Sequence, residues 1–236
     1  MPVGRGPWTD PPCIRLPAVL IALDGPSGAG KGTVSRAVAE ALACPHVDTG
    51  AMYRAVGWLA VQQGVALDAD DAVAALAEAA SFDLDAGRVV IDGHDVTTAI
   101  RTSDMDQAAA RVARLPAVRR VLLARQRAYA ASGAVVMEGR DIGTVVLPDA
   151  DVKFFLDASA DERARRRASD SAHASGGTDV GTVAQALRTR DELDRTRTAS
   201  PLARAEDAVY IDTTDLSAAE VVAQVLAEIS ARRASL

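Results

Sequence analysis

A glycine-rich segment near the N-terminus constrains the fold of this chain more than any other part of the sequence. Residues 25–33 read GPSGAGKGT, directly after an apolar run at residues 18–23 and directly before a segment with helical periodicity. A strand, a glycine loop with this spacing and a helix together form a cradle for phosphate. Glycines let backbone N–H groups converge on an anion, and the helix start adds partial positive charge. We expect the following residues to bind a nucleoside triphosphate: Gly25, Pro26, Ser27, Gly28, Ala29, Gly30, Lys31, Gly32 and Thr33.

Lys31 is the residue of this loop expected to reach the β- and γ-phosphates. Of the 26 basic residues in the chain, only Lys31 and Lys153 are lysines, so a lysine at this site indicates a need for a compact charge. The next position, where such loops commonly carry the Ser or Thr that ligates Mg²⁺, is Gly32, and the hydroxyl comes one residue later at Thr33. We therefore expect Mg²⁺ to be held by the nucleotide phosphates and through water, without a direct protein ligand. This G-K-G-T ending resembles the loop of the nucleoside monophosphate kinases.

The length and charge of the chain limit its possible classes. With 236 residues, 49% of them hydrophobic, it can fold as one large domain, which we place at residues 18–231. Residues 1–17 hold five prolines and no apolar core, so we expect a loose tail there.

The net charge of −6 argues against a general nucleic-acid or membrane binder, and no apolar run approaches the roughly 20 residues of a spanning helix. Cys13 and Cys44 lack metal-site spacing and suggest reduced thiols in the cytoplasm, where we expect a monomer.

Strand-like and helix-like segments alternate along most of the chain. Helices are expected at residues 31–43, 50–63 and 70–80, near Met105, from Pro116, after capping boxes at Ser159/Glu162 and Ser217/Glu220, and through 188–197. Strands are expected at residues 134–137, 152–156 and 208–211, and a small β-hairpin insertion at 82–100. The stretch 172–181, rich in Gly, Ser and Ala, is expected to be mobile. This alternation predicts an α/β fold with a mostly parallel sheet flanked by helices on both sides.

Three further segments carry residues suited to an anion. Residues 48–54 (DTGAMYR) place a hydroxyl and an arginine at one helix start. Residues 138–144 (EGRDIGT) follow a buried strand, where α/β sheets present ligand-binding residues. Residues 190–197 (RDELDRTR) follow the Gly/Ser-rich stretch. Any one of these arginines could be ordinary surface charge, but together with the phosphate loop they predict a nucleotide site.

These segments resemble the bacterial cytidylate kinase family, whose members are P-loop nucleoside monophosphate kinases. The similarity runs from about residue 19 to residue 229, with the markers GPSGAGKGT, DTGAMYR, Ile100-Arg101-Thr102, EGRDIGTVVLPDA and DRTRTASPL. Residues 82–102 resemble the NMP-binding insertion of the family, and residues 163–183 its mobile lid. The resemblance implies transfer of a phosphoryl group from ATP, with Mg²⁺, to CMP and also to dCMP.

The resemblance also implies roles for individual residues. CMP would be bound by a phosphate clamp (Thr49, Arg54 and Arg140), a cytosine-reading pair (Arg119 and Asp141), and ligands of ribose and phosphate (Arg190, Asp194 and Arg197). Catalysis would depend on Lys31, on Arg140 and on the lid arginines Arg163, Arg166 and Arg167. Glu138, at a strand end, could hold a Mg²⁺-bound water, as could Thr33.

Two positions depart from the family pattern. Ala110 stands where many members carry a serine that contacts cytosine, and Leu193 where some carry another arginine. Both departures concern the strength of base recognition and leave the reaction intact.

The expected reaction needs no general base, because an acceptor phosphate is already a dianion at neutral pH. We accordingly expect surface or loop roles for the histidines His46, His94 and His173.

Two other functions stay open on the sequence alone. A P-loop kinase for UMP, AMP, dTMP or shikimate would share the loop, but the pair Arg119/Asp141 and the β-insertion favour CMP. A nucleotide-dependent switch that transfers no phosphoryl group would need no monophosphate site. The switch hypothesis would therefore leave four arginines without a role, namely Arg54, Arg140, Arg190 and Arg197.

Overall fold

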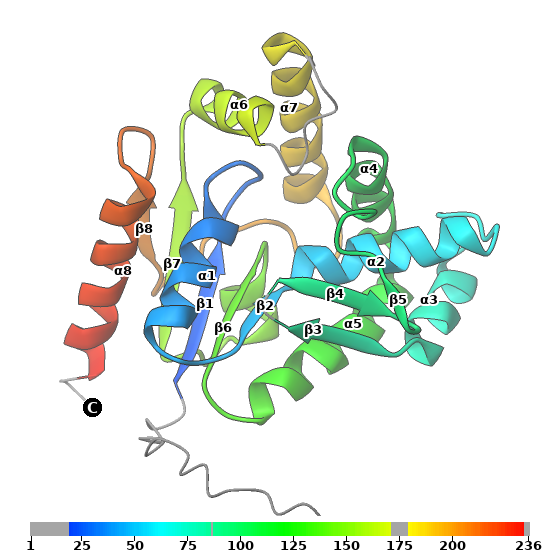
Figure 1. Ribbon diagram of the computed structural model, residues 1–236, viewed down its shortest axis with the longest axis horizontal. Helices are drawn as coiled ribbons and strands as arrows, with labels where there is room; N and C mark the ends of the chain where they lie inside the picture. The colour runs from blue at the N-terminus through cyan, green and yellow to red at the C-terminus, as the bar shows by residue number, and fades with distance from the viewer. Residues whose placement is uncertain (1–18, 86, 171–178, 234–236) are drawn as a thin grey trace, which may run out of the picture.

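The structure is a computed structural model that describes residues 19–85, 87–170 and 179–233 (Figure 1). The expected tail at residues 1–17 lies outside the described residues, as does most of the Gly/Ser-rich stretch at 172–181. The helices are α1 (Lys31–Ala41), α2 (Thr49–Gln62), α3 (Asp70–Ala79), α4 (Ser103–Val112), α5 (Pro116–Ala131), the π-helical turn η1 (Ile142–Val146), α6 (Ala160–Ser169), α7 (Val180–Thr196) and α8 (Ala218–Arg233). The strands are β1 (Leu20–Asp24), β2 (His46–Asp48), β3 (Phe82–Asp85), β4 (Arg88–Ile91), β5 (His94–Asp95), β6 (Val135–Gly139), β7 (Val152–Asp157) and β8 (Val209–Asp212).

The main sheet is parallel, as the alternation of elements predicted. Within the described residues its strand order is β2-β6-β1-β7-β8, and every recorded pairing in it is parallel. β1 lies in the middle, with β6 on one side and β7 on the other, so the chain crosses over in both directions from it. The carboxyl ends of β1 and β6 therefore lie side by side, which is where open α/β sheets bind ligands.

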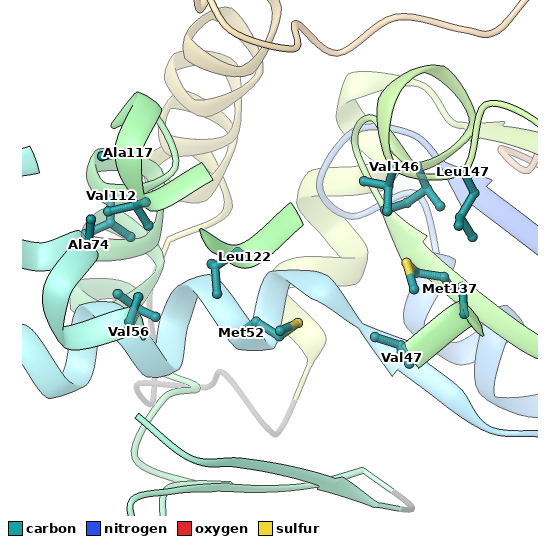
Figure 2. Close-up of a cluster of buried hydrophobic side chains, with 14 of the residues drawn as sticks. Val47, Met52, Val56, Ala74, Val112, Ala117, Leu122, Met137, Val146 and Leu147 are labelled. Carbon is teal, nitrogen blue, oxygen red and sulfur yellow. The ribbon is translucent and has the colours of Figure 1, made fainter. Parts of the chain in front are cut away.

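Helices cover both faces of this sheet. On one face Met52 and Val56 of α2 gather with Leu122 of α5 and with Met137 of β6 (Figure 2). On the other face α1 and α8 pack on the same strands through apolar residues such as Val38 and Ile229, both almost fully buried. α8 buries Val221 and Val225 in the same cluster. The predicted α/β class, a parallel sheet between two helical layers, is confirmed.

The β-type segments at residues 82–100 form a separate antiparallel sheet with the order β3-β4-β5. Its apolar face, which includes Val89 and Ile91, packs with Ala55 and Leu59 of α2. The insertion is therefore attached to the helix that starts at the DTGAMYR segment.

Local differences from the expected elements have simple causes. α1 ends at Ala41 instead of residue 43, because Ala43 takes a positive φ of 49° as the chain turns toward β2. β2 was not expected, since three residues are too few to show a periodicity. Among the described residues no helix is long and apolar enough to cross a membrane.

Candidate active site

A polar cavity of about 640 Å³ lies at the carboxyl ends of β1 and β6. It is lined by the glycine loop, by the start of α2, by α4, and by residues of α6 and α7. In Figure 1 the helices α4, α6 and α7 lie at this end of the sheet. The volume falls within the range typical of small-molecule sites.

The glycine loop has the backbone geometry that its sequence predicted. Gly25 takes a φ of +147°, and a Cβ there would lie 1.9 Å from the carbonyl oxygen of Leu156, so only glycine fits. Gly30, with φ 87°, is the N-cap of α1 and carries no side-chain cap. The first N–H groups of α1 are thus left to a ligand of the cavity.

Lys31 is buried at the start of α1. Its Nζ donates to the carbonyl oxygen of Pro26 at 2.7 Å. Burial, together with the nearby positive charge of Arg140, lowers the pKa of Lys31 to about 7. A phosphate placed beside it would supply the negative charge that a buried ammonium needs.

Asp24 ends β1 immediately before the glycine loop and is also buried. Its two carboxylate oxygens accept hydrogen bonds from the backbone N–H groups of Ile142 (2.8 Å) and Gly143 (2.7 Å). Burial raises the pKa of Asp24 to about 6, although these hydrogen bonds lower it. The carboxylate ties β1 to η1 and so fixes the segment that presents Arg140 and Asp141. The sequence reasoning missed it; an acidic residue inside the buried end of an apolar run was the available signal.

Glu138, at the end of β6, belongs to a small hydrogen-bonded group. Its Oε1 accepts from Ser35 Oγ at 3.1 Å and lies 3.0 Å from His46 Nε2, and these two partners are 2.9 Å apart. The expectation that His46 has only a surface or loop role is wrong, because β2 brings it against β6. A Cβ on Gly32 would lie 3.3 Å from the same Oε1. The carboxylate therefore occupies the space that the usual Ser or Thr of such a loop would need.

Carboxylates pair with most of the arginines expected to bind the acceptor. Arg140 Nε donates to Asp194 at 2.9 Å, and Arg54 Nη2 donates to Asp48 at 2.9 Å. The Asp194 carboxylate raises the pKa of Arg140 above its ordinary value, although burial alone would lower it. Burial lowers the pKa of Arg190, and the charge of Arg140 adds to this effect. Positive charge is thus concentrated in a partly desolvated space.

Thr49 and Arg197 are the remaining residues expected to bind the acceptor. The Thr49 hydroxyl donates to the backbone carbonyl of Glu138 at 2.8 Å. Arg197 Nη2 lies 3.3 Å from Asp141 Oδ1. Both Thr49 and Arg197 line the cavity, as do Arg54, Arg140, Arg190 and Asp194.

The expected cytosine-reading pair is split between the cavity wall and the layer behind it. Asp141 and Ala110 line the cavity. Arg119 is buried behind the wall, where it donates to Asp141 and lies over the Tyr53 ring at 5.7 Å from its centroid. Leu193 does not line the cavity.

The three expected lid arginines do not share one environment. Arg163 is buried, donates to the carbonyl oxygens of Ser27 (3.1 Å) and Ala158 (3.1 Å), and pairs with Asp191. It supports the glycine loop from behind and does not line the cavity. We therefore correct its assignment from a catalytic lid residue to a support of the loop.

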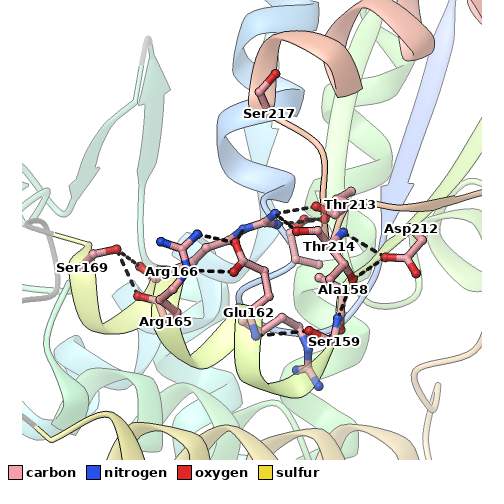
Figure 3. Close-up of polar contacts among 12 residues, drawn as sticks. Ala158, Ser159, Glu162, Arg165, Arg166, Ser169, Asp212, Thr213, Thr214 and Ser217 are labelled. Atoms are coloured by element: carbon pink, nitrogen blue, oxygen red, sulfur yellow. Dashed lines mark hydrogen bonds and ion pairs between the residues drawn. The ribbon is translucent and has the colours of Figure 1, made fainter.

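Arg166 and Arg167 do line the cavity, together with Arg165, which the sequence reasoning left out. Arg166 is held by Glu162 and by Thr213, whose Oγ1 accepts from it at 2.9 Å (Figure 3). Arg167 pairs with Asp106 of α4, another residue that the sequence reasoning missed. The sequence presents these arginines as one charged run (Arg163, Arg165, Arg166 and Arg167), and only the packing of α6 gives them different environments.

Similarity to known proteins covers nearly all of the described chain. The model of the cytidylate kinase family matches residues 21–231. A cytidylate kinase of Geobacillus sp. (strain WCH70) is 44% identical over 218 residues, covering 91% of this chain and 97% of the relative. One of Pelotomaculum thermopropionicum is 46% identical over 90% of this chain and 96% of its own, and one of Streptomyces avermitilis 42% identical over 93% and 96%.

Solved structures of lower identity share the fold alone. An uncharacterized protein from Eubacterium ventriosum superposes with a TM-score of 0.54 at 12% identity, covering 90% of this chain and 98% of that one. A gluconokinase from Sinorhizobium meliloti gives a TM-score of 0.50 at 19% identity over 92% and 93%. The family match and the high identity of full-length relatives carry the assignment. The chain belongs to the cytidylate kinase family.

Proposed function

We propose that this protein transfers the γ-phosphoryl group of ATP to CMP and dCMP. The observation that carries the proposal is one continuous cavity lined both by the glycine loop and by four arginines, Arg54, Arg140, Arg190 and Arg197. The relatives named cytidylate kinase, similar along nearly their whole length, support the choice of CMP.

On the ATP side, the N–H groups of the loop and the start of α1 would hold the phosphates. Lys31 would leave the Pro26 carbonyl for the β/γ-phosphates, and α6, acting as the lid, would bring Arg166 and Arg167 to the transferring group. Charge and alignment are what a loose phosphoryl-transfer transition state requires.

On the acceptor side, Thr49, Arg54 and Arg140 would clamp the CMP phosphate, and Arg190 and Arg197 would complete its charge balance. Asp194 would accept from a ribose hydroxyl, and Asp141, with Arg119 behind it, would read the base. The phosphate dianion is itself the nucleophile at neutral pH, so the arginines need only offset the repulsion between two anions.

The residues around Gly32 fit a Mg²⁺ ion that arrives with ATP. Glu138 and Thr33 offer oxygen atoms, which Mg²⁺ prefers, and both residues line the cavity. Among the described residues no cluster of His, Cys, Asp or Glu could hold a metal by itself. In this proposal Glu138 and Thr33 would hold the ion through water, and the ion would neutralise phosphate charge.

Further expectations belong to the same proposal. We propose that the protein works as a monomer in the cytoplasm and binds small nucleotides but no nucleic acid. The net charge of −6 supports the last point.

A coupled assay of ADP release from ATP tests the proposal with CMP, with UMP and without an acceptor. We expect release to require an acceptor and to favour CMP over UMP. Lys31→Ala should lose most of the activity while Arg232→Ala, which removes an exposed cation of α8, keeps it. Equal release with UMP would favour a different monophosphate kinase, and release without acceptor would favour the switch.

A further inference from the structure

Asp106 lies on α4, on the wall of the cavity, four residues before Ala110. α4 begins after Thr102, whose Oγ1 accepts from the N–H of Met105 at 3.3 Å. Four residues are close to one helical turn, so Asp106 and Ala110 face the same side. The carboxylate is thus directed at the space where we propose that CMP binds.

Within the part of the chain that the structure describes, three guanidinium groups lie close to this carboxylate. Asp106 Oδ2 accepts from Arg167 of α6, and Oδ1 lies 3.0 Å from Arg190 Nη1 of α7 and 3.8 Å from Arg54 Nη1 of α2. All four side chains are between 14% and 19% exposed, so water screens them only in part.

The three arginines come from separate elements and share this carboxylate as a partner. A carboxylate and a phosphate offer guanidinium groups the same kind of bidentate oxygen pair. Both anions cannot occupy the same arginines without strong repulsion, because two like charges in a partly desolvated space repel.

We propose that Asp106 is a positioning residue that stands in for the acceptor phosphate. Without CMP its carboxylate holds Arg54, Arg167 and Arg190 together. When CMP binds, the substrate phosphate replaces the carboxylate as the partner of Arg54 and Arg190. This inference rests on the proposed function and adds a residue to it. Part of the binding free energy between CMP and the arginines is then offset by the loss of their ion pairs with Asp106. Asp106 would keep its pairing with Arg167, which joins α6 directly to α4.

The test is the affinity of Asp106→Asn for CMP and for cytidine, measured by calorimetry. Asparagine keeps the shape and removes the charge that competes with phosphate. We expect CMP to bind about tenfold more tightly than to the wild type, the equivalent of about 1.4 kcal/mol. Cytidine has no phosphate, so its affinity should change by less than about twofold, well below the tenfold change expected for CMP. Asp104→Asn is the matched control, because it removes the same charge from an exposed position on the same helix.

Each other outcome overturns the inference. Weaker or equal CMP binding by Asp106→Asn would mean that the carboxylate does not compete with phosphate, and a gain of the same size in Asp104→Asn would reduce it to general charge. If neither Asp106→Asn nor Asp106→Ser folds, as judged by circular dichroism, the carboxylate is an irreplaceable part of the structure and no stand-in. The proposed function fails separately, through absent CMP turnover by the wild type.

Discussion

At the scale of single residues, the site depends on charged groups held in unusual surroundings. Lys31 is buried against the Pro26 carbonyl with a pKa lowered to about 7, and Asp24 is buried immediately before the glycine loop with a pKa raised to about 6. Both shifts have burial as their largest cause, and both groups touch the glycine loop or the segment facing it. Displaced pKa values of this kind are common at functional sites.

The pKa of Lys31 makes ATP binding dependent on pH. Below pH 7 the lysine is already protonated, whereas above it the bound phosphates must draw a proton onto Nζ. We expect ATP affinity to fall as pH rises above 7, with uptake of up to one proton at pH 8. Calorimetry at pH 8 in buffers of different ionisation enthalpy measures that uptake. The difference from Lys31→Met removes the titration of ATP itself, and equal uptake by the two proteins would contradict the assignment.

Ala110 makes base selectivity testable. It lines the cavity, as Asp141 does, but offers no hydrogen bond from its side chain. Ala110→Ser should add one bond to cytosine, worth about 0.5–1.5 kcal/mol, and raise the preference for CMP over UMP by up to about tenfold. The measurement is the ratio of kcat/KM for the two substrates. Ala110→Cys has nearly the same size without a strong hydrogen-bonding group and should change the ratio little; an unchanged ratio in the serine variant would place residue 110 away from the base.

At the scale of elements, side chains at strand ends hold the segments of the site in register. Asp24 joins the end of β1 to η1, and Ser35 and His46 join α1 and β2 to Glu138 on β6. In each case the two elements are far apart in sequence, and only β2 and β6 are neighbours in the sheet. The geometry of the cavity is therefore set by links between elements and not within them.

Asp24→Asn tests the link between β1 and η1. The amide has only one oxygen, so one of the two buried N–H groups loses its acceptor, and we expect a loss of about 1–3 kcal/mol in the free energy of unfolding. Denaturant unfolding measures it. Asp151→Asn is the matched control, since Asp151 accepts from the N–H of Leu20 at the exposed start of the same strand and should cost less. Equal losses in both variants would show that Asp24 contributes no more than a surface acceptor.

At the scale of the whole molecule, the local charge of the site is opposite to the charge of the protein. The chain carries a net charge of −6, while the cavity is lined by arginines from α2, α6 and α7. A positive field confined to a hollow can still attract an anionic substrate. The net negative charge of the chain disfavours extended polyanions.

This charge distribution predicts a salt dependence. Raising KCl from about 50 mM to about 300 mM shortens the screening length to about 6 Å, so kcat/KM for CMP should fall several-fold. Binding of uncharged cytidine over the same range is the control and should stay nearly constant. A flat response of kcat/KM would mean that the cavity arginines are already balanced by the carboxylates beside them.

The sequence by itself determined the parts of this protein that depend on local backbone and side-chain periodicity. The glycine loop at residues 25–33 follows from its own steric requirements, as at Gly25, and the alternation of apolar strands with helices led to the parallel sheet. The motif residues at strand and helix ends identified most of the cavity lining, because the carboxyl ends of parallel strands meet at one edge.

Only the tertiary structure decided which charged groups meet. Arg163 and Arg166 lie three residues apart on one helix, yet one supports the loop and the other lines the cavity. His46 acquired a partner through β2, a strand too short to predict, and Asp106 met arginines from three other elements. Local pattern specifies the face and the period of an element, whereas the pairing of long charged side chains depends on the angles and distances between elements. Those distances are fixed by the packing of the whole core.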